Sequence, residues 1–249
     1  MKLKDLFPKG AKSVAFCFGR LNPPTLGHKA LLDKLAESNP NYKIFVSQTQ
    51  DKKDNPLDYE TKIKFIKAMF PEHASHVVVN RGLNTIMKIV VELYDEGYRD
   101  LTVVAGSDRL DSFKNLIENY NGVEGKGHGF YKFDSITFVS SGEREDGAEG
   151  VSGISATRAR EAARNGDKEK FAQATGAGDL TDKLYDAVRN GLGINEEGVG
   201  KWHISPSGVK TNMPPADDDY AINYGKKGLV AKDRKSRGVD VGTGTRKVK

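Results

Sequence analysis

Residues 13–28 of the chain read SVAFCFGRLNPPTLGH, and this stretch decides the fold class. Its first part, Ser13 to Phe18, is almost entirely apolar, which is typical of a strand buried on both faces of a sheet. Two prolines then mark a turn. The segment Leu26 to Ala36 places apolar residues three and four positions apart, as an amphipathic helix does. A buried strand that passes through a short turn into a helix is the repeating unit of an α/β fold with a parallel sheet.

The same alternation of strand and helix continues outward from this stretch to about residue 140. Four more apolar runs predict strands, and three more periodic segments predict helices between them. We therefore expect a Rossmann-like α/β fold whose parallel five-stranded sheet carries helices on both faces. The further predicted strands are Tyr42–Gln48, His76–Asn80, Leu101–Ala105 and Ile136–Ser140, and the further predicted helices are Tyr59–Phe70, Thr85–Glu96 and Leu110–Tyr120.

The chain changes character after residue 150. Three short helices are predicted at Ser155–Arg164, Lys168–Thr175 and Thr181–Gly191, with glycine-containing turns between them. Beyond these C-terminal helices the sequence is rich in Gly, Lys, Asp and Pro and has too few apolar residues to form a core of its own. We therefore divide the chain into a globular domain over residues 1–195 and an irregular basic C-terminal tail over residues 196–249.

The positive charge of the chain is concentrated in that tail. Residues 201–249 hold 11 Lys and Arg against 5 Asp and Glu, whereas the first 200 residues hold 28 against 29. The globular part is therefore nearly neutral, and the overall charge of +5 is poor evidence that the fold itself binds nucleic acid.

Several classes of protein are disfavoured by composition. No run approaches the roughly 18 apolar residues of a membrane helix, and the N-terminal stretch MKLKDLFPKGAKS lacks the apolar region of a signal peptide. The single cysteine, Cys17, lies in the first predicted strand and cannot form an internal disulfide or a Cys-rich zinc site. The histidines at positions 73, 76, 128 and 203 show no ligand spacing. We expect a soluble cytoplasmic protein with no membrane partner and no metal held by the protein.

The loop after the first strand carries the first chemical motif. Thr25, Gly27 and His28 fall in the first turn of the predicted helix, where unpaired backbone N–H groups and the helix dipole attract phosphate. Gly27 leaves room for a phosphate to approach, and His28 adds a hydrogen-bond donor. The alternative is that Thr25 only caps the helix and His28 is a surface residue.

Two further motifs follow later strands. In GISATRAR, residues 153–160, Ser155 or Thr157 can cap a helix, and Arg160 can hold phosphate oxygens with its forked guanidinium. Gly106 and Asp108, after the fourth predicted strand, suit contacts with a sugar, a base edge or a hydrated metal. Ordinary helix capping, including a helix start at Asp108, is the alternative for each motif when it is taken alone. All three motifs, however, lie at carboxyl ends of strands, where an open α/β sheet binds its ligands.

Together, GRLNPPTLGH and ISATRAR resemble the T/H-x-G-H nucleotidyltransferase superfamily, which includes the nicotinamide-nucleotide, phosphopantetheine and flavin adenylyltransferases and the small cytidylyltransferases. The resemblance covers residues 12–175, the core of a nucleotidyltransferase domain over residues 1–195. It extends to bacteriophage-encoded members, for which the compartment would be the host cytoplasm.

The resemblance implies roles for individual residues. Thr25 and His28 would hold the triphosphate at the transferred α-phosphate, and Arg160 would close on the β- and γ-phosphates. Asn22 departs from the Asp or Gln of relatives, and Ala156 replaces a Ser or Gly. The remaining nucleotide-binding positions implied are Gly19, Arg20, Asn22, Gly27, Gly106, Asp108, Ser155 and Thr157.

The implied reaction is transfer of a nucleoside monophosphate, AMP from ATP, to a phosphorylated acceptor such as nicotinamide mononucleotide, with release of pyrophosphate. Mg²⁺ would arrive with the triphosphate. Lys52, Lys53 and Arg81 follow the second and third predicted strands and are candidates for the acceptor phosphate, although solvated surface charge is the alternative. We also expect a homo-oligomer. Transfer of CMP from CTP remains open, and so does a structural role in which the basic tail binds nucleic acid or an assembly.

Overall fold

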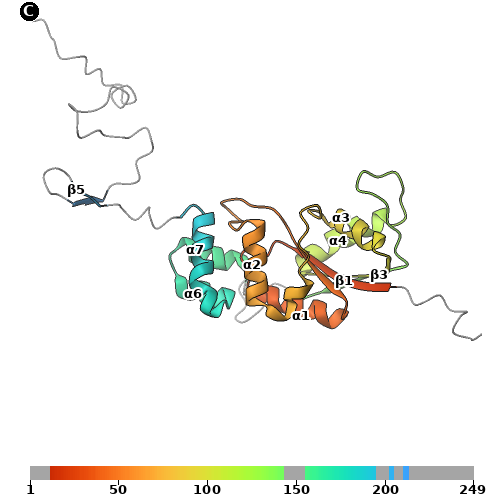
Figure 1. Ribbon diagram of the computed structural model, residues 1–249, viewed down its shortest axis with the longest axis horizontal. Coiled ribbons are helices and arrows are strands. Elements are labelled where there is room, and N and C mark those ends of the chain that lie inside the picture. Colours follow the sequence, from red (N-terminus) through yellow and green to blue (C-terminus); the bar gives the residue numbers. More distant parts are fainter. Residues whose placement is uncertain (1–11, 143–154, 195–201, 205–209, 213–249) are drawn as a thin grey trace, which may run out of the picture. The chain divides into compact units, whose positions relative to one another are not determined.

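The computed structural model describes residues 12–142, 155–194, 202–204 and 210–212 (Figure 1). The chain divides into two units, residues 1–193 and 194–249. The first unit contains a parallel sheet of four strands in the order β2-β1-β3-β4. The strands are β1 (Lys12–Gly19), β2 (Tyr42–Val46), β3 (Tyr98–Ala105) and β4 (Ser135–Ser140). Its α-helices are α1 (Leu26–Ser38), α2 (Tyr59–Met69), α3 (Ile86–Asp95), α4 (Ser107–Tyr120), α5 (Ala156–Arg164), α6 (Lys168–Thr175) and α7 (Thr181–Gly191).

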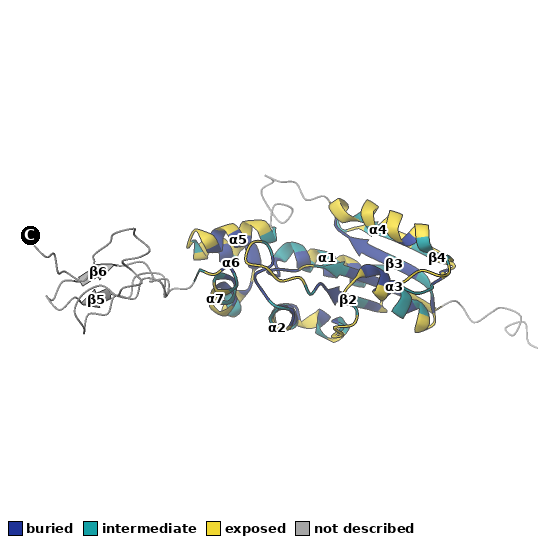
Figure 2. Cartoon of the chain, turned by 90° about the horizontal axis from the view of Figure 1, so that it is seen from above, coloured by how far each residue is buried: buried dark blue, intermediate teal, exposed yellow. Residues whose placement is uncertain are grey.

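The two faces of β1 belong to different cores, which explains why the strand is apolar throughout. Val14 and Phe16 pack in one core with residues of α3 and α4, while Ala15 and Cys17 pack in the other with residues of α1 and α2. Figure 2 shows the central strands as largely buried. The expected parallel sheet with helices on both faces is therefore confirmed. Burial also raises the pKa of the Cys17 thiol to about 12, so this thiol stays protonated and unreactive at neutral pH.

The third of the five expected strands, His76–Asn80, is wrong as a strand. The 3₁₀ helix η2 (Pro71–His76) ends just before Val77. Val77 makes a single parallel bridge to Ile44 of β2. Beyond this bridge the backbone pairs with other groups. The Asn80 N–H donates to the hydroxyl of Tyr59 at 3.2 Å. Pairing at this edge of the sheet is therefore limited to one bridge.

Two helices begin with a capping side chain, and a third helix begins earlier than predicted. Ser155 accepts a hydrogen bond from the Arg158 N–H at the start of α5, and Asp58 accepts one from Thr61 at the start of α2. Helix α4 begins at Ser107, three residues before the predicted start, with Gly106 at its N-cap. Asp108 therefore lies within the first turn and is not the capping residue. A cap at Gly106 places the start of α4 directly at the end of β3.

The second unit contains a two-stranded antiparallel sheet, in which β5 (Trp202–Ile204) pairs with β6 (Lys210–Asn212). This segment was expected to be irregular, and strands of three residues are too short to show a period in the sequence. The rest of the predicted basic tail lies outside the described residues. Among the helices that the structure describes, none combines the length and the apolar character needed to cross a lipid bilayer.

Candidate functional site

The sequence motifs converge at the carboxyl edge of the sheet. The turn between β1 and α1 follows the end of β1, α4 begins directly after β3, and Ser155 and α5 follow β4 along the chain. Two of these motifs are in direct contact, because the Arg160 Nη1 group donates to the Asn22 carbonyl oxygen at 2.9 Å. The residues Gly153 and Ile154 of the second motif lie outside the described part of the chain.

The turn after β1 is shaped by backbone sterics. Leu21 has a φ of +44°, in the left-handed region, and its side chain folds back over the end of the strand. A Cβ atom on Gly19 would lie 2.8 Å from the Cδ1 atom of Leu21. A side chain at position 19 would therefore require the Leu21 side chain to shift. The resemblance implies a nucleotide-binding role for Gly19, and in the structure this glycine lies against the Leu21 side chain.

Thr25 and His28 form a reciprocal contact at the start of α1. The Thr25 backbone N–H donates to His28 Nδ1 at 3.1 Å, and the Thr25 hydroxyl lies 2.9 Å from the same nitrogen. Because an amide N–H can only donate, Nδ1 must be the acceptor, and the proton of the neutral imidazole sits on Nε2. His28 is 9% exposed and Thr25 1%. The helix thus fixes both the orientation and the tautomer of His28.

Asn22 is engaged by the segment that follows β2. Its Nδ2 group donates to the Leu57 carbonyl at 2.9 Å, and its Oδ1 atom accepts from the Leu57 N–H at 3.0 Å. The residue is 1% exposed. Nucleotide binding is the role that the resemblance implies for Asn22, but its amide group here joins the turn after β1 to the segment after β2.

Arg160 is buried against the same turn. Besides Asn22, its guanidinium donates to the Thr157 hydroxyl at 3.1 Å and lies 3.5 Å from Asp54 Oδ1. Desolvation lowers the pKa of Arg160, while the Asp54 charge opposes that change. Its Nε group has no hydrogen-bond partner within the described residues. A buried cation with one half-exposed counter-ion is an arrangement that can accept a further anion.

The other predicted nucleotide-binding residues are placed as follows. Gly27 lies in the first turn of α1, and Gly106 caps α4 at the end of β3. Asp108 is exposed in the first turn of α4, and its carboxylate lies 3.9 Å from Arg109 Nε. Arg20 is exposed on the turn after β1, close enough to Arg160 to influence its pKa. These residues lie at the same sheet edge, at helix starts or on the connecting turn.

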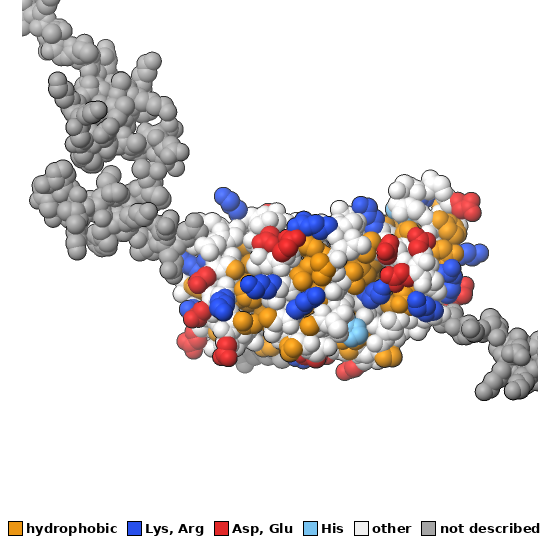
Figure 3. Space-filling view, in the orientation of Figure 1, with side chains coloured by type: hydrophobic (Ala, Val, Ile, Leu, Met, Phe, Trp, Pro, Cys, Tyr) orange, Lys and Arg blue, Asp and Glu red, His pale blue; other side chains and the backbone are white. Residues whose placement is uncertain are grey.

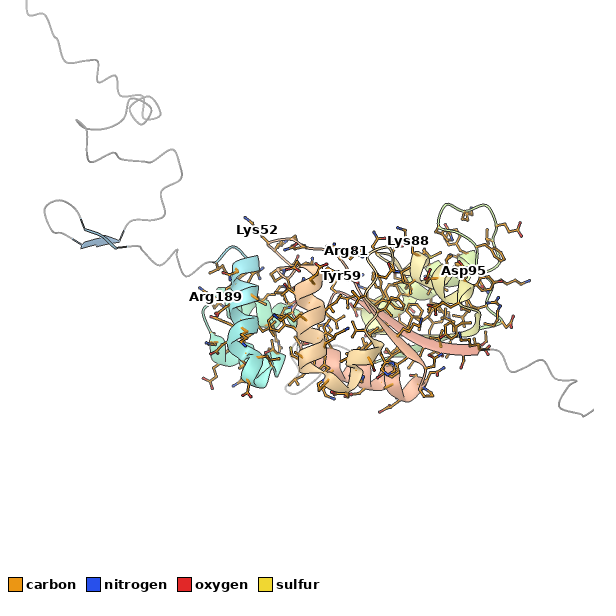
Figure 4. All side chains as sticks on the ribbon, in the orientation of Figure 1. Lys52, Tyr59, Arg81, Lys88, Asp95 and Arg189 are labelled. Atoms are coloured by element: carbon orange, nitrogen blue, oxygen red, sulfur yellow. The ribbon has the colours of Figure 1, made fainter. Side chains whose placement is uncertain are left out.

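The three candidates for the acceptor phosphate differ in their surroundings. Lys52 and Lys53 are exposed on the turn after β2. Arg81 is held by an ion pair with Glu60, and its guanidinium lies 5.4 Å from the centre of the Tyr59 ring. Figure 4 shows Arg81 and Tyr59 together, with Lys52 labelled separately. Arg81 is thus already paired, whereas the described structure assigns no such ion pair to either lysine.

Sequence reasoning missed Lys62, a fully buried lysine on α2. Its ammonium group donates to the carbonyl oxygens of Ser47 at 2.5 Å and Thr49 at 3.4 Å, both just after β2. Burial lowers the pKa of Lys62 to about 8, with Asp58 opposing the change. Helical spacing was the available signal, because position 62 shares a face with the buried residues Tyr59 and Ile66.

One histidine joins an acidic cluster away from this edge. Ligand atoms of Asp33, Glu72 and His73 lie within 4.8 Å of one another, a proximity that the sequence spacing does not reveal. Lys29 pairs with both carboxylates, at 2.9 Å from Asp33 and 3.0 Å from Glu72. His73 also contacts the Tyr42 hydroxyl at 2.8 Å. These polar groups thus already satisfy one another.

Comparison with known proteins identifies relatives over this region. A family model described as cytidylyltransferase-like matches residues 16–162. This range includes Thr25, His28 and Arg160. The "Probable nicotinate-nucleotide adenylyltransferase" of Acholeplasma laidlawii is 32% identical over 117 residues, which cover 41% of this chain and 61% of that relative. The chain thus spans about three fifths of that relative.

A solved structure is also similar. The crystal structure of a "Putative Nicotinate-nucleotide Adenylyltransferase" from Vibrio parahaemolyticus shares 18% identity and a TM-score of 0.44. The alignment covers 68% of this chain and 98% of that one.

Proposed function

The chain belongs to the cytidylyltransferase-like family, and from that premise we propose that it transfers AMP from ATP to a phosphorylated nucleotide acceptor and releases pyrophosphate. The acceptor class proposed is the mononucleotide of nicotinate or nicotinamide. The observation that carries the proposal is the contact between two segments suited to binding phosphate, the turn that leads into α1 and the helix α5, at the carboxyl ends of the strands. His28 is oriented at the start of α1, and Arg160 reaches the same turn from α5.

The chemistry assigned to these residues is orientation and charge stabilisation. An acceptor phosphate oxygen attacks the α-phosphorus, a new P–O bond forms, and the bond to the bridging oxygen of pyrophosphate breaks. His28, with its proton on Nε2, would donate to an α-phosphoryl oxygen, and the N–H groups that begin α1 would add their dipoles. Arg160 would stabilise charge on the departing pyrophosphate. A direct displacement of this kind needs no covalent bond to the protein.

The triphosphate would bind as its Mg²⁺ complex, so the metal is part of the substrate. We assign no ligand from the chain to it, since the Asn22 amide is engaged by Leu57. Adenylyl transfer is preferred because the relative at 32% identity carries an adenylyltransferase name. Cytidylyl transfer is the second candidate, because the matching family model is described as cytidylyltransferase-like.

The test is pyrophosphate release measured for the full chain with ATP, CTP, GTP and UTP. Each is paired with nicotinate mononucleotide, nicotinamide mononucleotide and phosphopantetheine. We expect release to require an acceptor and to be fastest with ATP and a pyridine mononucleotide. Faster release with CTP would replace adenylyl by cytidylyl transfer. Absence of acceptor-dependent release with all four triphosphates would contradict nucleotidyl transfer itself.

A further inference from the structure

The turn over residues 51–55 is built rigidly around one carboxylate. Asp51 Oδ1 accepts from the backbone N–H groups of Lys53 at 2.9 Å and Asp54 at 2.6 Å, and Oδ2 accepts from Asn55 Nδ2 at 2.5 Å. These hydrogen bonds lower the pKa of Asp51 to about 2, the Asn55 side chain contributing most. The turn closes through the Asp51 N–H, which donates to the Asn55 carbonyl at 2.9 Å. Asp54 is therefore presented from a fixed backbone.

Two arginines of α5, one helical turn apart, hold this turn from the other side. Arg164 donates to the Lys53 carbonyl oxygen, and Arg160 faces the Asp54 carboxylate. The Arg160 side chain is 9% exposed and that of Asp54 is 45% exposed. Their separation of 3.5 Å exceeds the roughly 2.7–2.9 Å of a well-formed charge-assisted hydrogen bond. Asp54 thus compensates the buried charge only in part.

The surroundings of Arg160 leave positive charge uncompensated. The charges of Arg20 and Arg164 both act to lower the pKa of Arg160. Two nearby acids, Asp54 and Asp51, act in the opposite direction, but the Asp51 oxygens are engaged by hydrogen bonds within their own turn, so only Asp54 forms an ion pair with Arg160. The Nε group of Arg160 is also buried without a hydrogen-bond partner in the part of the chain that the structure describes. Buried charged groups are ordinarily paired and fully hydrogen-bonded, so this cation is suited to a stronger anion.

We propose that Asp54 takes the place of a phosphoryl group on Arg160 when no substrate is bound, and that the phosphates of the triphosphate displace it. This rests on the proposed function and names a positioning residue that acts through Arg160. Asp54 competes with the substrate for one guanidinium and thereby sets the affinity for the triphosphate. Phosphate carries more charge and more acceptor oxygens than a carboxylate, so it is the stronger partner for this guanidinium.

The test is calorimetric titration of inorganic pyrophosphate into the full chain. Asp54→Asn removes the competing charge and keeps the side-chain shape, so we expect the Kd for pyrophosphate to fall by about threefold to tenfold. Asp182→Asn is the matched control. It makes the same charge change at a surface ion pair with Lys168 on other helices, and its Kd should stay within about twofold of the wild type.

A second measurement separates competition from a merely structural role. Asp54→Asn leaves Arg160 without its counter-ion, so its Tm should be lower than that of the wild type without pyrophosphate and should recover at saturating pyrophosphate. An unchanged or raised Kd in Asp54→Asn, or a Tm deficit that saturating pyrophosphate does not reduce, would overturn the proposal. Pyrophosphate binding with these shifts but without nucleotidyl transfer would refute the proposed reaction and leave the role of Asp54 intact.

Discussion

At the scale of single residues, the imidazole of His28 is held in one orientation at the start of α1. Its Nδ1 atom accepts from the Thr25 N–H, and this leaves the proton on Nε2. We expect His28→Ala to lower kcat by about 100- to 1000-fold, the scale on which loss of one transition-state donor acts. Steady-state pyrophosphate release measures the effect, and thermal melting verifies the fold.

His128→Ala is the matched control for that substitution. His128 lies in the connection from α4 to β4, which enters the sheet at its opposite edge. The turnover of the His128→Ala enzyme should stay within about twofold of the wild type. A His28→Ala enzyme that retained a third or more of wild-type turnover would remove His28 from the mechanism.

The buried Lys62 should make the free energy of unfolding depend on pH. Its pKa is lowered to about 8 in the folded chain, against 10.5 ordinarily, so the unfolded chain binds the extra proton between these values. Stability from this residue therefore rises as the pH increases from about 8 to 10.5, and below pH 8 the full cost of burying the ammonium remains. The rise should be on the order of 2 kcal/mol.

Urea unfolding at pH 7 and pH 10 measures this rise, with Lys62→Met as the reference that lacks the titrating group. The wild type should gain stability relative to Lys62→Met between the two pH values. An equal pH dependence in both proteins would show that Lys62 does not titrate there.

Some of these residue roles were accessible from sequence and others were not. Thr25, His28 and Arg160 stand at fixed positions relative to strand and helix boundaries, so local pattern places them at one sheet edge. The partner of Asn22 lies 35 residues away at Leu57, and only the tertiary structure brings its backbone amide and carbonyl into register. Asp54 likewise meets Arg160 across more than 100 positions of sequence.

At the scale of elements, the link between the turn after β1 and the segment after β2 depends on Asn22. Asn22→Asp places an oxygen opposite the Leu57 carbonyl and loses a buried donor. We expect a loss of about 2–3 kcal/mol in the free energy of unfolding, together with reduced turnover. Chemical denaturation measures the change in the free energy of unfolding.

Asn41→Asp is the control for this change. Asn41 Nδ2 also donates to a backbone carbonyl, that of Ser13 at 2.8 Å, but the site is exposed, so the loss should be under about 1 kcal/mol. If Asn22 instead contacted the metal–triphosphate complex, Asn22→Asp would keep or raise activity at unchanged stability.

Elements with strong local signals were predicted well. Helices α6 and α7 have the bounds expected from their periodicity and flanking turns. The prediction of a strand at His76–Asn80 is wrong for a tertiary reason. The Asn80 N–H, which a strand would have paired with its neighbour, donates instead to the Tyr59 hydroxyl. The start of α4 was placed late because its first turn, Ser107 to Arg109, is polar, and apolar periodicity begins only at Leu110.

At the scale of the whole molecule, charge is divided unevenly between the globular part and the tail. Figure 3 shows basic and acidic side chains interspersed over the visible face of the first unit. The excess of basic residues over acidic ones lies in residues 201–249. We therefore expect removal of residues 198–249 to leave nucleotidyl transfer within about twofold. Any affinity for DNA should be lost with those residues and should decrease steeply with salt in the full chain.

Turnover, Tm and salt-dependent DNA binding of the two forms measure this separation. A truncated chain that folds but no longer catalyses would show that the tail completes the active site. Trp202, the only tryptophan, lies in the deleted part, so its fluorescence in the full chain provides an independent report on that segment.

We infer that a nucleoside monophosphate passes directly from its triphosphate to the acceptor, at the sheet edge that carries His28 and Arg160. The most direct measurement follows ATP radiolabelled at the α-phosphorus, with nicotinate mononucleotide as acceptor. We predict that all of the transferred label appears in the dinucleotide product, with one pyrophosphate released for each product and no label retained on the denatured protein. Label recovered in ADP, or bound covalently to the chain, would contradict the account.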